Sequence, residues 1–157
     1  MREVYICDAI RTPIGRFGGG LSSVRADDLA AVPIKALIEH MQLKAIERPT
    51  VLYWGCRSRA DLYLQEWAEA TAAQMPQLRY VPVLSENRDA DWRGRTGLVH
   101  HAVMADLPDL SAYQVYACGA PVMVDSARAD FVARCGLPAD EFYADAFTSE
   151  ADKHPAV

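Results

Sequence analysis

The chain has 157 residues, of which 51% are hydrophobic and 24% are charged, and its formal net charge at pH 7 is −5. This length and composition fit one globular domain with its own core. Acidic and basic residues are interspersed, which argues against nucleic-acid binding, and no apolar run approaches the roughly 20 residues of a membrane-spanning helix. The 4 cysteines are widely spaced, so we expect reduced thiols and a cytoplasmic location rather than a disulfide framework or zinc site.

The first part of the chain predicts a strand, a glycine-rich loop and a helix. The strand covers residues 4–10, and the loop 11–23 contains three consecutive glycines that break regular structure. This loop lacks the G-x-G-x-x-G spacing, so we favour a surface loop over a phosphate site. A helix is expected over 27–42, although Pro33 would fit better in the first turn of a helix than in its interior.

Strands and helices alternate through the rest of the chain. Short segments rich in β-forming residues are separated by segments whose apolar residues recur at helical spacing. The expected strands are 50–55, 78–84, 115–117 and 141–147, and the expected helices are 61–74, 97–105 and 122–134. Together with strand 4–10, this order predicts an α/β fold: a doubly wound, mainly parallel, five-stranded Rossmann-like sheet with helices on both faces.

Open sheets of this kind bind ligands beyond the carboxyl ends of their strands. The residues expected at that edge are Arg57, Arg59, Ser85, Glu86, Cys118, Gly119, Ala120 and Pro121. The turn after strand 115–117 would expose bare backbone, with a small polarisable thiol facing the crevice. Each candidate also has a structural alternative: the two arginines as surface charges, Glu86 as a solvated loop acid and Cys118 as a buried thiol.

From Pro33 onward, the sequence resembles the pyridine-nucleotide domain of the ferredoxin-reductase family, especially the NADH-linked flavin reductases that carry an iron–sulfur domain. The C-G-x-P-x-M pattern, formed by Cys118, Gly119, Pro121 and Met123, is its most specific part. The segments that carry the resemblance are 33–39, 51–55, 61–63, 80–85, 94–97, 116–123 and 145–147.

The resemblance implies roles for these residues. The Cys118 turn would border the nicotinamide ring where hydride passes to flavin, with Cys118 positioning the reacting carbon while the cofactors carry the chemistry. Glu86 would accept the adenosine ribose hydroxyls and repel a 2′-phosphate, which favours NADH over NADPH, although Arg57 and Arg59 could offset this charge. Phe147 matches the family's aromatic residue on the flavin side, and is equally well explained as a core residue.

Residues 1–38 are instead similar to the amino-terminal region of thiolases, the acyl-CoA acyltransferases. Segments 7–19 and 27–33 carry this second resemblance, and nothing in the chain matches the distant catalytic residues of thiolases. Both resemblances include residues 33–38, which predicts a chimera joined within a shared helix. We therefore expect one α/β domain with a thiolase-like part (1–32), a reductase-like part (33–148) and a polar tail (149–157).

The junction affects the expected cofactor site. The reductase family would present G-T-G-x-x-P before this helix, and its two glycines correspond to Asp28 and Ala30. The carboxylate of Asp28 would lie near a diphosphate that is best bound by bare amides. We expect the fold to survive with residues 4–10 replacing the lost first strand, nucleotide binding to be weak, and unaided hydride transfer to be absent because the FAD-binding domain is missing.

Three hypotheses follow. The first is the NAD(H)-binding domain of an oxidoreductase that passes hydride from NADH to flavin, incomplete as an isolated chain and partnered by a flavin or iron–sulfur domain. The second is a non-catalytic fusion scaffold, and the third is a thiolase fragment. Self-association is expected through any sheet face that the missing flavin domain leaves exposed. No metal site is predicted, because His100 and His101 are adjacent and should face apart on a helix.

Overall fold

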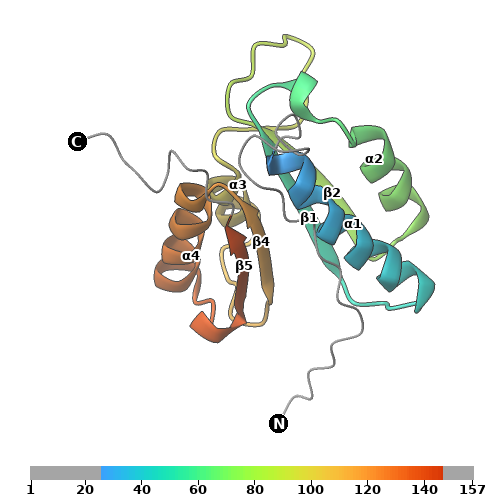
Figure 1. Ribbon diagram of the computed structural model, residues 1–157. Coiled ribbons are helices and arrows are strands. Elements are labelled where there is room, and N and C mark those ends of the chain that lie inside the picture. The colour runs from blue at the N-terminus through green and yellow to red at the C-terminus, as the bar shows by residue number, and fades with distance from the viewer. Residues whose placement is uncertain (1–25, 147–157) are drawn as a thin grey trace, which may run out of the picture. The chain divides into compact units, whose positions relative to one another are not determined.

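The computed structural model describes residues 26–146, and the chain divides into two compact units, Met1–Ile46 and Glu47–Val157. The described part of the first unit contains the helix α1 (Ala26–Leu43), drawn in blue in Figure 1. It continues through Pro33, so the helix does not begin there. Alanines and leucines, which are strong helix formers, surround this proline and favour continuation. The expected strand 4–10 and loop 11–23 lie outside the described residues.

The second unit follows the expected order of strands and helices. Its described strands are β1 (Thr50–Cys56), β2 (Leu78–Leu84), β3 (Arg95–Thr96), β4 (Val115–Gly119) and β5 (Phe142–Ala146). Its α-helices are α2 (Gln65–Gln74), α3 (Val99–Asp106) and α4 (Pro121–Cys135), and two 3-10 helices are η1 (Arg59–Asp61) and η2 (Ala139–Glu141). The helix expected from residue 61 therefore begins at Gln65, after η1 and a turn. The short strand β3 was not expected.

All strand pairs are parallel, which confirms the α/β class, but the described strands form two sheets. One sheet has the order β1-β2-β3 and the other consists of β4 and β5. The edge of β1 away from β2 and the edge of β4 away from β5 have no strand partner among residues 26–146. The expected single five-stranded sheet is thus not formed by the described residues, since one of its five strands was assigned to residues 4–10.

Helical segments cover both faces of the β1–β2 sheet. Because side chains alternate along a strand, Tyr53 and Trp54 point to opposite faces. The Tyr53 hydroxyl donates a hydrogen bond to Asp106 of α3 (3.1 Å), while the Trp54 ring meets Tyr63 edge-on with centroids 5.4 Å apart. Asp106 also pairs with Arg95 of β3, so one largely buried carboxylate ties α3 to two strands.

The main hydrophobic core of the second unit lies between α3, α4 and the β4–β5 sheet. Its buried residues are Leu110, Val124, Ala127, Phe131, Cys135, Leu137 and Phe142. Pro121 begins α4, where its missing amide hydrogen costs nothing. Gly136 ends the helix in the left-handed conformation (φ 70°), which glycine adopts without steric cost. Because α4 contributes several of these buried residues, the core holds in place the helix that follows the Cys118 turn.

Candidate functional site

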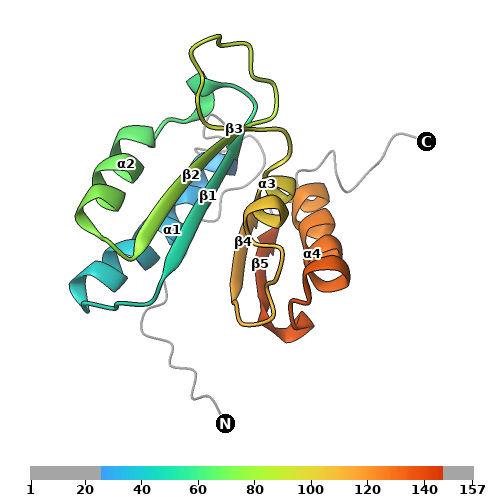
Figure 2. The ribbon, with the colours of Figure 1, turned by 180° about the vertical axis from the view of Figure 1, so that it is seen from behind.

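Figures 1 and 2 show the carboxyl ends of β1, β2, β4 and β5 on the same side of the second unit. Two backbone hydrogen bonds extend the β1–β2 pairing beyond the strands. The Ser85 amide donates to the Cys56 carbonyl (2.8 Å), and the Glu86 amide donates to the Arg57 carbonyl (2.9 Å). Arg57, Ser85 and Glu86 are all exposed. The structure therefore brings these three predicted residues together at the expected edge.

Arg59 lies one turn further on, in η1. This helix is held by a capping box in which Asp61 accepts hydrogen bonds from the Ser58 amide (3.0 Å) and the Ser58 hydroxyl (2.8 Å). The box fixes the backbone that carries Arg59 while the guanidinium side chain remains exposed. Arg59 is therefore available to an anion near the end of β1, but also fits the alternative of an ordinary surface charge.

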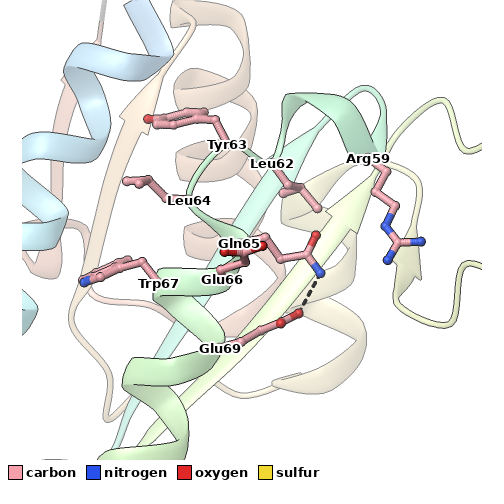
Figure 3. Close-up of a pocket in the computed structure, with 8 residues that line it drawn as sticks. All are labelled: Arg59, Leu62, Tyr63, Leu64, Gln65, Glu66, Trp67 and Glu69. Atoms are coloured by element: carbon pink, nitrogen blue, oxygen red, sulfur yellow. Dashed lines mark hydrogen bonds between the residues drawn. The ribbon is translucent and has the colours of Figure 1, made fainter.

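Arg59 also borders a pocket of about 560 Å³, shown in Figure 3. Its lining residues are Arg59, Leu62, Tyr63, Leu64, Gln65, Glu66, Trp67 and Glu69. Gln65 donates a hydrogen bond to Glu69 across this surface (2.6 Å). The two carboxylates of the lining would repel a diphosphate, and neither Glu86 nor Cys118 belongs to it. We therefore do not assign this pocket to the nucleotide.

The Cys118 turn lies at the end of β4. The strand extends through Gly119, two residues further than expected, and Ala120 then caps α4. Val115 and Ala117 pack on the core beneath α4, so the alternation of the strand directs Cys118 to the opposite face. The thiol is half-buried there, beside the face that carries the stacked rings of Tyr116 and Tyr143 (centroids 5.0 Å apart).

Gly119 has a φ of +148°, a conformation that other residues rarely adopt. A Cβ at this position would also lie 2.6 Å from Cε of Met123. Only Ala120 therefore separates the end of β4 at Gly119 from the beginning of α4 at Pro121. The structure places Gly119, Ala120, Pro121 and Met123 in one strand–turn–helix.

Gly119→Ala is expected to lower the free energy of unfolding by about 1–3 kcal/mol, because alanine is strained at this φ. The matched control is Ala120→Ser, which places a favourable capping residue at the next position and should leave stability unchanged or slightly raised. Urea unfolding of the three proteins measures both effects. Equal stability of Gly119→Ala and the parent would contradict the observed backbone conformation.

The other predicted parts of the cofactor site are Phe147 and the diphosphate positions. Phe147 lies outside the described residues. The diphosphate positions 28–32 belong to α1, where no glycine turn is present. No helix among the described residues is long and apolar enough to cross a membrane.

Sequence reasoning missed the close approach of His100 and His101, whose ring centroids are 4.3 Å apart. These adjacent helical residues therefore do not face apart, contrary to the prediction.

Comparisons with known proteins support both resemblances. The family model of the oxidoreductase NAD-binding domain matches residues 30–129. The CDP-6-deoxy-L-threo-D-glycero-4-hexulose-3-dehydrase reductase of Yersinia pestis is 39% identical over 137 residues, covering 82% of this chain and 41% of that protein. The solved ferredoxin reductase in carbazole 1,9a-dioxygenase is similar with a TM-score of 0.59 and 27% identity, covering 69% of this chain and 32% of that one.

The thiolase similarity is separate and shorter. The β-ketoadipyl-CoA thiolase of Pseudomonas putida is 60% identical over 60 residues, covering 38% of this chain and 15% of that protein. The thiolase matches 38% of this chain and the Yersinia reductase matches 82%, which together exceed the whole chain. The two matched regions therefore overlap, as a junction within a shared segment requires. The chain spans 41% of the length of the Yersinia reductase and 34% of the Salmonella typhimurium protein RfbI, to which it is 41% identical over 120 residues.

Proposed function

Because this chain belongs to the NAD-binding domain family of the ferredoxin and flavin reductases, we propose that it binds a nicotinamide nucleotide as the hydride-donating part of such a reductase. The observation that carries the proposal is the turn from Cys118 to Pro121. There, Gly119 lets the backbone turn sharply at the carboxyl edge of β4. The residues of the turn are small, and the thiol of Cys118 is half-buried, as suits a ligand that lies against the carboxyl end of a strand.

Within this proposal, the chain positions the nucleotide and does not itself accept hydride. Cys118 would contact the nicotinamide ring, and Gly119 and Ala120 would let the ring approach the backbone. Pro121 and Met123 would hold the beginning of α4 behind it. A flavin, supplied by a domain outside this chain, would accept the hydride. An isolated chain is therefore expected to bind nucleotide without turning it over.

NADH is proposed as the preferred nucleotide because of the charge at the end of β2. Glu86 is exposed, and its backbone is tied to Arg57. A carboxylate there can accept ribose hydroxyls and would repel a 2′-phosphate. The exposed guanidinium groups of Arg57 and Arg59 reduce this discrimination, so we expect a modest preference and not an absolute one.

A second candidate function is a non-catalytic scaffold. It is favoured by the continuous helix over positions 28–32. Beyond its first turn a helix uses its amides in its own hydrogen bonds, so most of these positions cannot offer bare amides to a diphosphate. Asp28 adds a negative charge to the same segment. The two candidates differ in whether the Cys118 turn and Glu86 suffice for measurable affinity.

Calorimetric titration of the full chain with NADH, NADPH and ADP-ribose tests the proposal. We expect NADH to bind weakly, with a dissociation constant on the order of 0.1–1 mM, and more tightly than NADPH. Glu86→Arg should shift the ratio of the two dissociation constants about tenfold toward NADPH, equivalent to about 1.4 kcal/mol. Glu69→Arg, the same charge change on α2, is the matched control and should leave the ratio unchanged.

Two outcomes would replace the proposal. Absence of binding by all three nucleotides would leave the scaffold function. Tight binding of coenzyme A, titrated in parallel, would instead favour a thiolase-derived function. An unchanged ratio in Glu86→Arg, with nucleotide binding intact, would reject the assignment of Glu86 to the ribose while preserving the nucleotide site.

A further inference from the structure

A cluster of three potential metal ligands lies where α3 meets α4, on residues that the proposed nucleotide site does not use. His100 and His101 are in the first turn of α3, and Asp130 is in α4. One nitrogen from each imidazole and one carboxylate oxygen all lie within 4.8 Å of one another. We propose that His100, His101 and Asp130 form a binding site for a divalent transition-metal ion such as Zn²⁺.

The two histidines lie at the beginning of a helix, which explains how adjacent residues can bind the same ion. In a helix interior, the preceding turn blocks some side-chain rotamers. His100 and His101 follow the cap residue Leu98 by two and three positions, so no preceding helical turn restricts them. Their rings lie edge to face with centroids 4.3 Å apart. One imidazole is buried and the other is exposed, which gives the cluster both a fixed side and a side open to solvent.

The spacing between His100 and Asp130 fits coordination better than a direct hydrogen bond. His100 Nε2 lies 3.5 Å from Asp130 Oδ2, beyond the usual range of about 2.7–3.2 Å for such a bond. Two tetrahedral ligands about 2.1 Å from a zinc ion are about 3.4 Å apart. An ion between these two atoms would therefore need little movement of either side chain, and His101 would approach from the exposed side.

The second oxygen of Asp130 faces Arg134. Arg134 Nη1 lies 3.4 Å from Asp130 Oδ1, one helical turn further along α4, whereas Oδ2 is the oxygen on the His100 side. The positive charge of Arg134 opposes a nearby cation, but its side chain is 62% exposed, and water screens much of that repulsion.

His100 is the buried member of the cluster. Burial lowers the pKa of this imidazole, the neighbouring His101 lowers it further, and Asp130 partly opposes both effects. Its Nδ1 is buried with no hydrogen-bond partner among the described residues. Metal-bound histidines usually have such a partner, and its loss costs about 10–100-fold in affinity, so we expect micromolar and not nanomolar binding.

The donor set selects the class of ion. Two imidazole nitrogens and one carboxylate oxygen suit Zn²⁺, Co²⁺, Ni²⁺ or Cu²⁺, whereas Mg²⁺ and Ca²⁺ prefer oxygen ligands alone. His101 is exposed and Asp130 is partly so, which leaves a position for water on the ion. Since the ligands come from two helices, a bound ion would join α3 to α4 and raise the thermal stability of the unit.

Titration of the full chain with Zn²⁺, followed by calorimetry and thermal unfolding, tests this proposal. We expect one ion per chain with micromolar affinity and a raised Tm, and no such effect with Mg²⁺. His101→Gln and Asp130→Asn should each weaken Zn²⁺ binding at least tenfold. Both change groups that are not fully buried, so the variants should still fold. His40→Gln removes a histidine of α1 and is the matched control that should bind like the parent.

Substitution with Co²⁺ identifies the donor atoms. Visible absorption bands without a thiolate charge-transfer band are expected for nitrogen and oxygen ligands, and they should disappear in His101→Gln. A thiolate band would place the ion on a cysteine and overturn the proposal, as would the absence of Zn²⁺ binding or unchanged affinity in both variants. The readout does not involve nucleotide, so its failure would leave the proposed function untouched.

Discussion

The double substitution Asp28→Gly with Ala30→Gly is expected to tighten NADH binding about tenfold, equivalent to about 1.4 kcal/mol. Each glycine disfavours helix by about 1 kcal/mol, so the beginning of α1 should unwind toward Pro33. Proline is well suited to the first turn of the shortened helix. The change would free amides for the diphosphate, place a helix N-terminus beside it, and remove one negative charge.

Calorimetry with NADH compares this variant with Ala26→Gly, Asp27→Gly. The control introduces the same number of glycines and removes one carboxylate, but upstream of the positions that match the family pattern. It should bind like the parent. Equal affinity of the parent and the Asp28→Gly, Ala30→Gly variant would count against a diphosphate site at residues 28–32. Equal improvement in both variants would show that loss of charge alone is responsible.

Much of the fold was predictable from local sequence patterns. The described strands β1, β2, β4 and β5 and the helices α3 and α4 lie within a few residues of their expected positions, because their composition and periodicity agree with their final structure. The beginning of α2 was less predictable. Asp61 is tied to Ser58 through a capping box, so the chain makes a short 3-10 helix first and α2 begins only at Gln65.

The candidate site was predictable in its parts and less so in its arrangement. A resemblance identified Glu86 and the Cys118 turn, and the parallel pairing of β1 with β2 brings Arg57 beside Glu86 as the fold class implies. The histidine cluster was missed because sequence spacing describes the directions of helical side chains only in a regular interior. At the first turn of α3, rotamers and the packing of α4 decide which rings meet.

By itself, the sequence determined the family, the order of the strands and helices, and the absence of the two diphosphate glycines. These features depend on residue identity and on local periodicity, which can be read along the chain. Only the tertiary structure decided how the strands are paired, which edges of β1 and β4 have no strand partner within residues 26–146, and where Asp130 meets the histidines of α3. Such pairings join residues far apart in sequence, and their free energy depends on which edges and faces the rest of the fold leaves available.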